Sequence, residues 1–96
     1  MYTVMWTIDV NEGTSKQDIV RGLEASAHEY KGIPGLVRTY FGVTANGKSV
    51  VEIYLWQTKA DADKFFSPHW ETLVSRRWQA APMRRQDWAT PLVVEN

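Results

Sequence analysis

The chain has 96 residues, enough for one domain over residues 1–96, and its lack of cysteine excludes disulfides and thiolate metal sites. Its 11 acidic and 11 basic side chains leave no net charge, which excludes nucleic acid and anionic membranes as main partners, because both attract concentrated positive charge. No apolar run is long enough to span a membrane, and the N-terminus lacks the basic and apolar regions of a signal peptide, so we expect a cytoplasmic protein.

Residues 2–10 alternate between apolar and polar side chains, which predicts a half-buried strand. Thr14 or Ser15 is then placed to cap a helix, and Thr14 with Gln17 fits a capping box. The helix is expected to end at Lys31–Gly32, with His28 on its solvent side. Its apolar stripe, at helical spacing, consists of Ile19, Leu23, Ala27 and Tyr30.

Two apolar runs flank Asn46–Gly47 and predict a β-hairpin with a two-residue type I′ turn. The register that follows pairs Val43 with Val50 and Val37 with Trp56. One face then carries Val37, Phe41, Val43, Glu52, Tyr54 and Trp56, and the other carries Arg38, Tyr40, Val51, Ile53 and Leu55. Both faces need a cover. Helices of this chain can cover one, and a second copy of the protein is the natural candidate for the other.

A second helix is expected to begin at Thr58, with Ala62, Phe65 and Phe66 pointing inward. Ser67–Pro68 interrupts it, and because Ser is a good cap and Pro suits the first helical position, the helix should restart there at a new angle. The restarted helix presents Trp70, Leu73, Val74, Arg77 and Trp78 on one face, and residues 80–82 should stop it.

The last predicted element is a strand from about Arg85 to Val94. Pro91 cannot donate to a ladder and therefore requires an edge strand or a bulge. The order β-α-β-β-α-β predicts a ferredoxin-like α+β fold: a four-stranded antiparallel sheet with helices on one face.

With these elements in place, the sequence resembles the antibiotic-biosynthesis-monooxygenase-like (ABM) proteins of the dimeric α+β barrel superfamily, especially a small bacterial branch. The motifs are Ile33–Leu36, Glu52–Trp56, Ala60–Phe66 and Trp88–Glu95. The resemblance implies a homodimer whose two sheets form a barrel, with an apolar cavity in each subunit between sheet and helices. It also implies a monooxygenase that acts on aromatic or polyketide-like small molecules without metal, flavin or haem. Fold transfers on such motifs better than activity does.

One branch of the superfamily degrades haem with Asn, Trp and His at defined places. By spacing, its Trp and His correspond to positions near Phe65 and Ser75, and the first strand offers Thr7 and Asp9 in place of the Asn. We therefore do not expect haem degradation.

Three residues are candidate catalytic groups. His69 adjoins the helix restart, where the positive end of a helix favours a neutral, base-competent imidazole, although a first-turn surface histidine fits the same sequence. Arg38 lies among aliphatics on a hairpin face and could bind a phenolate or a superoxide-like anion, or pair structurally. Tyr40 could polarise the same pocket or be a packed residue with a satisfied hydroxyl.

Candidate walls for a flat aromatic ligand are Trp70, Phe65, Trp6 and Trp78, all of which could instead be core. Glu52 is interpreted first as an ion pair in the dimer interface and second as a general base. Arg76–Arg77 and Arg84–Arg85 form a local basic cluster that is interpreted as solvated and structural.

The sequence leaves three functions open. The first is a cofactor-independent monooxygenase with a small apolar or aromatic substrate. The second is a non-catalytic dimeric module, small-molecule-binding or stress-related, of the same fold. The third is a dimerisation unit whose aromatic residues fill the core.

Overall fold

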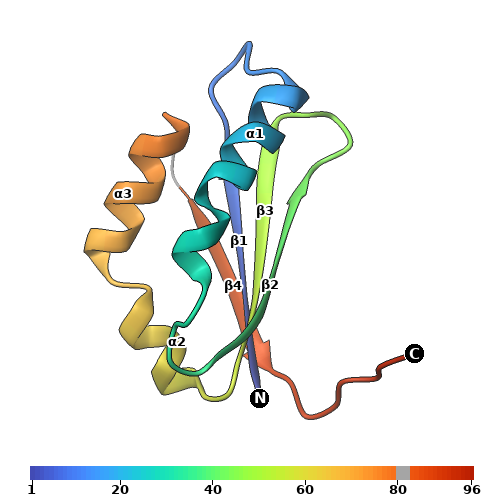
Figure 1. Cartoon of the computed structure of the whole chain (residues 1–96), viewed down its shortest axis with the longest axis vertical. Coiled ribbons are helices and arrows are strands. Elements are labelled where there is room, and N and C mark those ends of the chain that lie inside the picture. The colour runs from blue at the N-terminus through green and yellow to red at the C-terminus, as the bar shows by residue number, and fades with distance from the viewer. Residues whose placement is uncertain (80–82) are drawn as a thin grey trace.

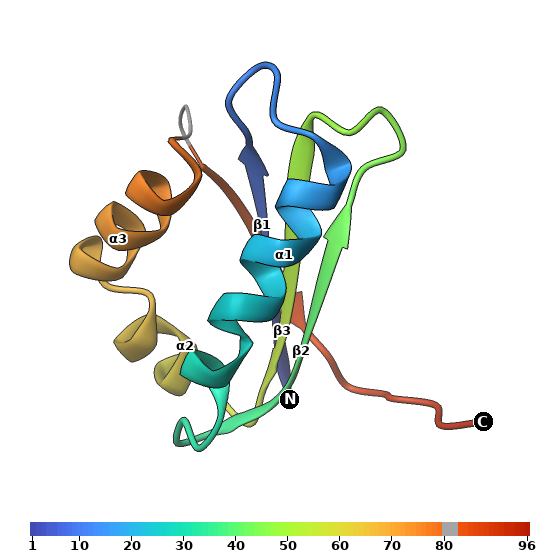
Figure 2. The same cartoon turned by 45° about the horizontal axis from the view of Figure 1, so that its top comes forward.

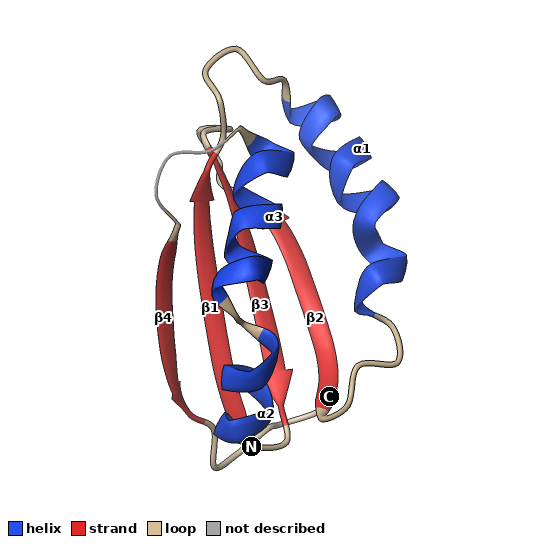
Figure 3. Cartoon of the chain, turned by 90° about the vertical axis from the view of Figure 1, so that its left-hand side faces the viewer, coloured by secondary structure: helices blue, strands red, loops and turns tan. Residues whose placement is uncertain are grey.

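A computed structural model describes residues 1–79 and 83–96 of the chain, which form a four-stranded antiparallel sheet with the helices on one face (Figures 1 and 3). The elements are β1 (Tyr2–Asp9), α1 (Lys16–Ser26), the 3-10 helix η1 (Ala27–Tyr30), β2 (Leu36–Val43), β3 (Ser49–Trp56), α2 (Lys59–Phe65), α3 (Pro68–Trp78) and β4 (Arg84–Ala89). The strand order is β2-β3-β1-β4, which confirms the predicted ferredoxin-like fold. Within the described ranges, none of the helices combines the length and apolarity that crossing a membrane requires.

The core lies between the sheet and the helices. Alternation along β1 buries its apolar side, as predicted, and the neighbouring β3 contributes a second row of large side chains. Helices α1, α2 and α3 close over these rows with their own apolar stripes. Buried core residues from the strands include Val4, Trp6, Ile8, Val50, Tyr54 and Trp56, and those from the helices include Ile19, Leu23, Ala62, Phe66, Trp70, Val74 and Trp78.

Helix α1 begins at Ser15. The Ser15 hydroxyl accepts a hydrogen bond from the Asp18 amide at 3.1 Å, while the Thr14 hydroxyl donates back to the carbonyl oxygen of Asn11 at 2.7 Å. Thr14 is therefore occupied in the preceding turn, and the capping box predicted between Thr14 and Gln17 is wrong. An acidic residue in the first turn, Asp18, suits the positive end of the helix dipole.

Two further caps are confirmed. Thr58 begins α2 by accepting from the Asp61 amide at 3.1 Å. Ser67 begins α3 by accepting from the Trp70 amide at 3.2 Å, with Pro68 at the first helical position. The second helical region therefore bends at Ser67, and Figure 2 shows α2 and α3 as separate segments.

The C-terminal end of the first helical segment differs from the prediction. At Ala27 the α-helix tightens into η1, with three residues per turn, which leaves Ala27 exposed, whereas Tyr30 is buried as predicted. His28 is exposed, as expected. In α3, Leu73 is 48% exposed rather than inward, and the helix ends at Trp78 with Gln79 in a left-handed conformation. The predicted stop at residues 80–82 lies outside the described residues.

The hairpin keeps its predicted register without the predicted turn. Val43 pairs with Val50, but the Gly47 amide donates to the Thr44 carbonyl oxygen at 2.8 Å. Of the two residues expected in the left-handed region, only Gly47 occupies it, with φ 73°. The type I′ turn is therefore wrong: a longer loop built around Thr44–Gly47 has the same centre and leaves the pairing unchanged.

At the other end of the hairpin, a β-bulge changes the pairing. Leu36 pairs with Trp56 and Arg38 with Leu55, so the predicted pair of Val37 with Trp56 is wrong. The extra residue lets Leu36 pack against the core while Val37 is 42% exposed.

Strand β4 is shorter than predicted and ends at Ala89 instead of Val94. It is an edge strand, and its last backbone contact is the Thr90 amide donating to the Met1 carbonyl oxygen at 2.8 Å. Pro91 follows and cannot donate, so the chain leaves the sheet there (Figure 1).

Candidate active site between the sheet and the helices

A cleft of about 200 Å³ opens between η1 and α3, on the helical side of the sheet. Tyr30 and Glu29 of η1 form one side, and residues of α3 form the other. Its lining consists of Glu29, Tyr30, Phe65, Trp70, Leu73, Val74 and Arg77. The cleft therefore combines aromatic walls with two charged groups of opposite sign.

A buried carboxylate lies on the same side of the sheet as this cleft. Glu52, in the middle of β3, is 1% exposed, and the Tyr54 hydroxyl donates a hydrogen bond to its Oε1. Burial raises the pKa of the Glu52 carboxyl, against the opposing effects of that hydrogen bond and of the Arg77 charge. Glu52 faces the helices, so the predicted ion pair across a dimer interface is wrong.

Tyr30 connects this buried pair to the cleft. Its ring centroid lies 5.7 Å from that of Tyr54, and its hydroxyl interacts with the Tyr54 hydroxyl and with the Arg77 guanidinium. Burial, followed by the Glu52 charge, raises the pKa of both tyrosines, and that of Tyr54 lies well above its ordinary value. The hydroxyls of Tyr30 and Tyr54 are therefore protonated around neutral pH.

An ion pair stands beside Tyr30. Arg77 Nη2 lies 2.6 Å from Glu29 Oε2, and the Arg77 side chain is 26% exposed. Arg77 remains accessible to solvent, as interpreted from the sequence, and the helical stripe of α3 also makes it part of the cleft wall. Its guanidinium could bind an anion there in place of, or together with, the Glu29 carboxylate.

The four aromatic residues predicted as pocket walls divide into two groups. Phe65 and Trp70 line the cleft, with ring centroids 5.9 Å apart. Trp6 packs behind Trp70, with centroids at 5.2 Å, and Trp78 packs against α1, so neither is part of the lining.

The predicted catalytic residues are not brought together. Arg38 and Tyr40 share the outer face of the sheet, where Arg38 Nη1 donates to Tyr40 Oη at 3.3 Å and Arg38 Nη2 lies 3.0 Å from Glu95 Oε1. Both are exposed, so the expected burial of Arg38 is not found. His69 is exposed on α3 and is not part of the cleft lining. The sheet separates Arg38 and Tyr40 from the cleft.

Sequence reasoning missed Tyr30 and Tyr54 as site residues. A signal was present: Glu52 is the one acidic residue in the apolar run 50–56, and Tyr54 lies two residues later on the same face. A lone carboxylate on a face that must be covered needs a hydrogen-bond donor, and Tyr54 is the nearest one in the strand.

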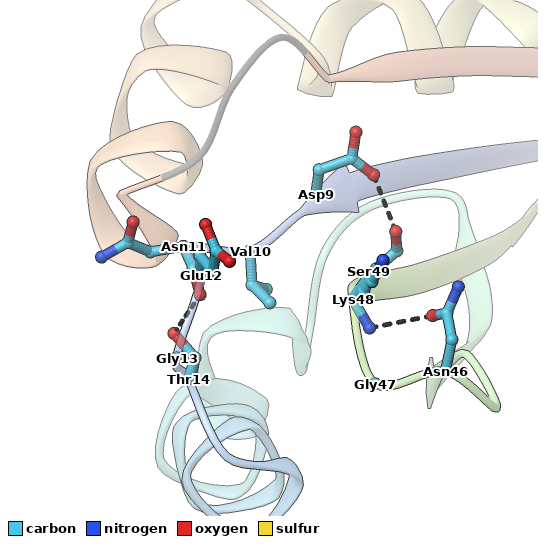
Figure 4. Close-up of a pocket in the computed structure, with 10 residues that line it drawn as sticks. All are labelled: Asp9, Val10, Asn11, Glu12, Gly13, Thr14, Asn46, Gly47, Lys48 and Ser49. Carbon is cyan, nitrogen blue, oxygen red and sulfur yellow. Dashed lines mark hydrogen bonds between the residues drawn. The ribbon is translucent and has the colours of Figure 1, made fainter.

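A larger, open groove of about 690 Å³ lies between the β1–α1 and β2–β3 loops (Figure 4). Asp9 in this groove is paired twice: Ser49 Oγ donates to its Oδ1 at 2.7 Å, and Arg84 donates to its Oδ2 at 2.8 Å. Hydrogen bonds from Arg84 and then Ser49 lower the pKa of Asp9 to about 2. These contacts join β1 to β3 and β4, so we interpret Asp9 as a structural residue. Across the part of the chain that the structure describes, no three His, Asp or Glu side chains are grouped to hold a metal ion.

No protein-family model matches the sequence, and no curated protein matches it. Solved structures do match its fold. One from Deinococcus radiodurans, assigned to antibiotic biosynthesis monooxygenases, has a TM-score of 0.75 at 7% identity, covering 100% of this chain and 98% of the other. SnoaB, a cofactor-independent oxygenase from Streptomyces nogalater, has a TM-score of 0.69 at 12% identity, covering 99% and 97%. A MhuD variant with two manganese protoporphyrin IX molecules per active site has a TM-score of 0.75 at 14% identity, and the match covers 100% of each chain.

At these identities the likeness shows the fold alone. The resemblance seen in the sequence is thereby confirmed at the level of architecture: this chain has the fold of antibiotic biosynthesis monooxygenases.

Proposed function

We propose that this protein is a cofactor-independent monooxygenase that acts on an aromatic or polyketide-like small molecule in the cleft between η1 and α3. The observation that carries the proposal is the buried Glu52–Tyr54 pair beside the aromatic cleft lined by Tyr30. A carboxyl whose pKa is raised by burial is a stronger base once ionised, which suits removal of a proton from a phenol or an enol. The fold shared with SnoaB supports the same chemistry.

The proposed reaction needs no electron donor besides the substrate. A deprotonated phenol or enol is an electron-rich carbanion that passes one electron to O₂, and the two radicals then combine through a new C–O bond. The hydroperoxide that results loses water and leaves a carbonyl group on the ring. One oxygen atom enters the product and the other leaves as water. The substrate supplies all four electrons, and the two hydrogens of the water come from the ring C–H and from the hydroxyl that is deprotonated first. The protein binds the substrate, removes the first proton and stabilises the anions.

The size of the cleft narrows the substrate class. Its volume of about 200 Å³ is below the range of about 300–1,000 Å³ usual for drug-sized ligands. We therefore favour substrates of about one or two fused rings over larger polycyclic ones. Phe65 and Trp70 would stack on the ring, and Arg77 would hold its oxygen anion.

A homodimer forms part of the proposal. The outer face of the sheet lacks a helical cover and carries large exposed side chains, with Tyr40 56% and Trp88 45% exposed. Two apolar residues of the C-terminal segment near this side are also exposed, Leu92 by 76% and Val94 by 73%. A second copy packed on this face would bury them and complete a barrel. Native mass spectrometry checks the assembly, and a monomer at micromolar concentration would contradict it.

A second candidate is a non-catalytic small-molecule-binding module. The observation that favours it is the filling of the core by four tryptophans, all at most 8% exposed, beside a cleft of only about 200 Å³. They are Trp6, Trp56, Trp70 and Trp78. Such a module would bind a phenol saturably and consume no oxygen.

Oxygen uptake with 1-naphthol, a two-ring phenol, after chelation of metals and removal of flavin, separates the two candidates. Uptake by the wild-type protein and a fall of about 100-fold or more in Glu52→Gln would support the monooxygenase. Tyr2→Phe is the matched control, because Tyr2 also donates to a carboxylate but lies away from the cleft. Saturable binding without uptake would favour the module. Loss of uptake in a combined His69→Ala and Arg38→Ala variant, with Glu52→Gln active, would place the catalytic site at the residues predicted from sequence.

A further inference from the structure

Glu52 has no direct contact with the cleft. Its side chain is 1% exposed, Tyr54 is fully buried, and neither is part of the lining. Tyr30 is part of the lining, its ring centroid lies 5.7 Å from that of Tyr54, and the two hydroxyls interact. The hydroxyl groups of these tyrosines therefore provide a route for a proton between the cleft and the buried carboxylate.

We infer that Glu52 receives the substrate proton through a relay of two tyrosine hydroxyls, from the substrate to Tyr30, from Tyr30 to Tyr54 and from Tyr54 to Glu52. This inference rests on the proposed function and adds a requirement to it: the substrate must present an acidic O–H group to Tyr30. Phenols and enols meet the requirement, and hydrocarbons without a hydroxyl do not.

The relay balances without any change in oxidation state. The substrate O–H bond breaks and a Tyr30 O–H bond forms, while the original Tyr30 proton moves to Tyr54 and the original Tyr54 proton moves to Glu52. Each hydroxyl gives up one proton and gains one, so no tyrosinate accumulates. The net products are a substrate anion in the cleft and a neutral carboxylic acid at Glu52.

The surrounding charges favour this direction of transfer. Ionised Glu52 is a negative charge in a desolvated position, and the relay moves that charge to the cleft, where the Arg77 guanidinium lies beside Tyr30. The other ionisable group at that end is Glu29, which holds Arg77 at 2.6 Å. A substrate anion would therefore compete with Glu29 for Arg77, and release of the anion would restore the ion pair.

The test uses 4-nitrophenol as the probe, under nitrogen, so that binding and proton transfer are measured without oxidation. Ionisation of the bound phenol is followed by its visible absorbance, and protonation of Glu52 by the carboxylic acid band in the infrared difference spectrum. In the wild-type protein we expect the bound phenol to be ionised below its solution pKa and the acid band to appear with it.

Three isosteric variants interrupt the relay at successive points: Tyr30→Phe, Tyr54→Phe and Glu52→Gln. We expect each to bind the probe and to lower the ionised fraction by about tenfold or more, without the acid band. Tyr2→Phe, the matched tyrosine that donates to Asp87, should behave as the wild type does. If Glu52→Gln or Tyr54→Phe does not fold, Tyr30→Phe still decides the question, because it leaves the Glu52–Tyr54 pair intact.

Ionisation of the bound phenol that persists in Tyr30→Phe, or that occurs without the acid band, would overturn the relay. Failure of the wild-type protein to bind 4-nitrophenol would overturn it as well. The outcome is separable from the proposed function: an acid band under nitrogen without oxygen uptake in air would leave the relay standing and refute the monooxygenase, and uptake without the band would do the reverse.

Discussion

Two tyrosine–carboxylate pairs in this protein share one chemistry and differ in their surroundings. Tyr54 donates to Glu52 between the sheet and the helices, and Tyr2 donates to Asp87 at 2.5 Å near the sheet edge, where solvent reaches both. The hydrogen bond from Tyr2 lowers the pKa of Asp87. At Glu52 the same kind of bond is outweighed by burial, and the pKa is raised. Desolvation therefore decides the sign of the pKa shift, and of these two pairs only the buried one contains a carboxylate whose protonation is favoured by its surroundings.

The largest expected difference between the pairs is in stability. Tyr54→Phe leaves the Glu52 carboxylate buried without its donor, which should lower the free energy of unfolding by about 2–4 kcal/mol. Tyr2→Phe should change it little, because water replaces the lost donor. Urea unfolding at neutral pH measures both. The double variant Tyr54→Phe, Glu52→Gln should recover part of the loss, and equal losses for the two single variants would contradict the difference in burial.

The two carboxyl groups should give opposite dependences of stability on pH. The pKa of folded Glu52 is above the ordinary 4.5, so the native protein holds more protons than the unfolded chain between these values, and the stability of the wild type relative to Glu52→Gln should fall as pH rises through this window. The pKa of folded Asp87 is below 3.8, so stability relative to Asp87→Asn should be present above 3.8 and lost as pH falls. Urea titrations across acidic and neutral pH check both signs, and parallel curves would refute the assignment.

The tyrosines themselves provide a third comparison, by alkaline titration of tyrosinate absorbance. The pKa of Tyr2 is raised first by its hydrogen bond to Asp87, so Asp87→Asn should return it most of the way to 10. The pKa of Tyr54 is raised first by burial and then by the Glu52 charge, so Glu52→Gln should lower it only in part. A full return of Tyr54 to its ordinary value would show that the pocket is wetter than the structure indicates.

The smallest expected difference between the two pairs is in how the pKa values of their carboxyl groups respond to salt. At 1 M salt the screening length is about 3 Å, so a partly exposed pair such as Arg85 and Asp87, 3.2 Å apart, is partly screened. The pKa of Asp87 should then move slightly towards its ordinary value, and that of Glu52 should stay unchanged. Carboxyl chemical shifts in NMR titrations measure both, and a larger shift at Glu52 would contradict its exclusion from solvent.

Most of the fold could be read from local patterns. Alternation along β1, the caps at Thr58 and Ser67, and the centre of the hairpin depend on neighbours in sequence, and the structure confirms them. The bulge at Val37 could not be read, because it depends on how the segment before β2 packs Leu36 into the core. The length of β4 was misjudged because apolar residues continue past Pro91 after the backbone pairing has ended.

The candidate site was less accessible from sequence. The hairpin register correctly placed Glu52 and Tyr54 on one face, but both faces of the hairpin are apolar, and nothing local says which one the helices cover. Arg38 and Tyr40 were assigned to the pocket for that reason, and they lie on the other face. Tyr30 was correctly placed on the inward stripe of the first helix, but its proximity to Tyr54 and Glu52 depends on how η1 packs against the sheet, which the sequence pattern does not indicate.

The contact between Gly22 and Trp78 bears on kinetics. A Cβ atom on Gly22 would lie 3.0 Å from the Trp78 ring, so α1 and α3 touch there, and the cleft lies between η1 and α3. Under the proposed function, substrate and product would share the side of the cleft that Arg77 and Glu29 line. A product that kept its oxygen anion on Arg77 would then slow the next turnover. Product inhibition competitive with the substrate is the kinetic signature that this packing implies.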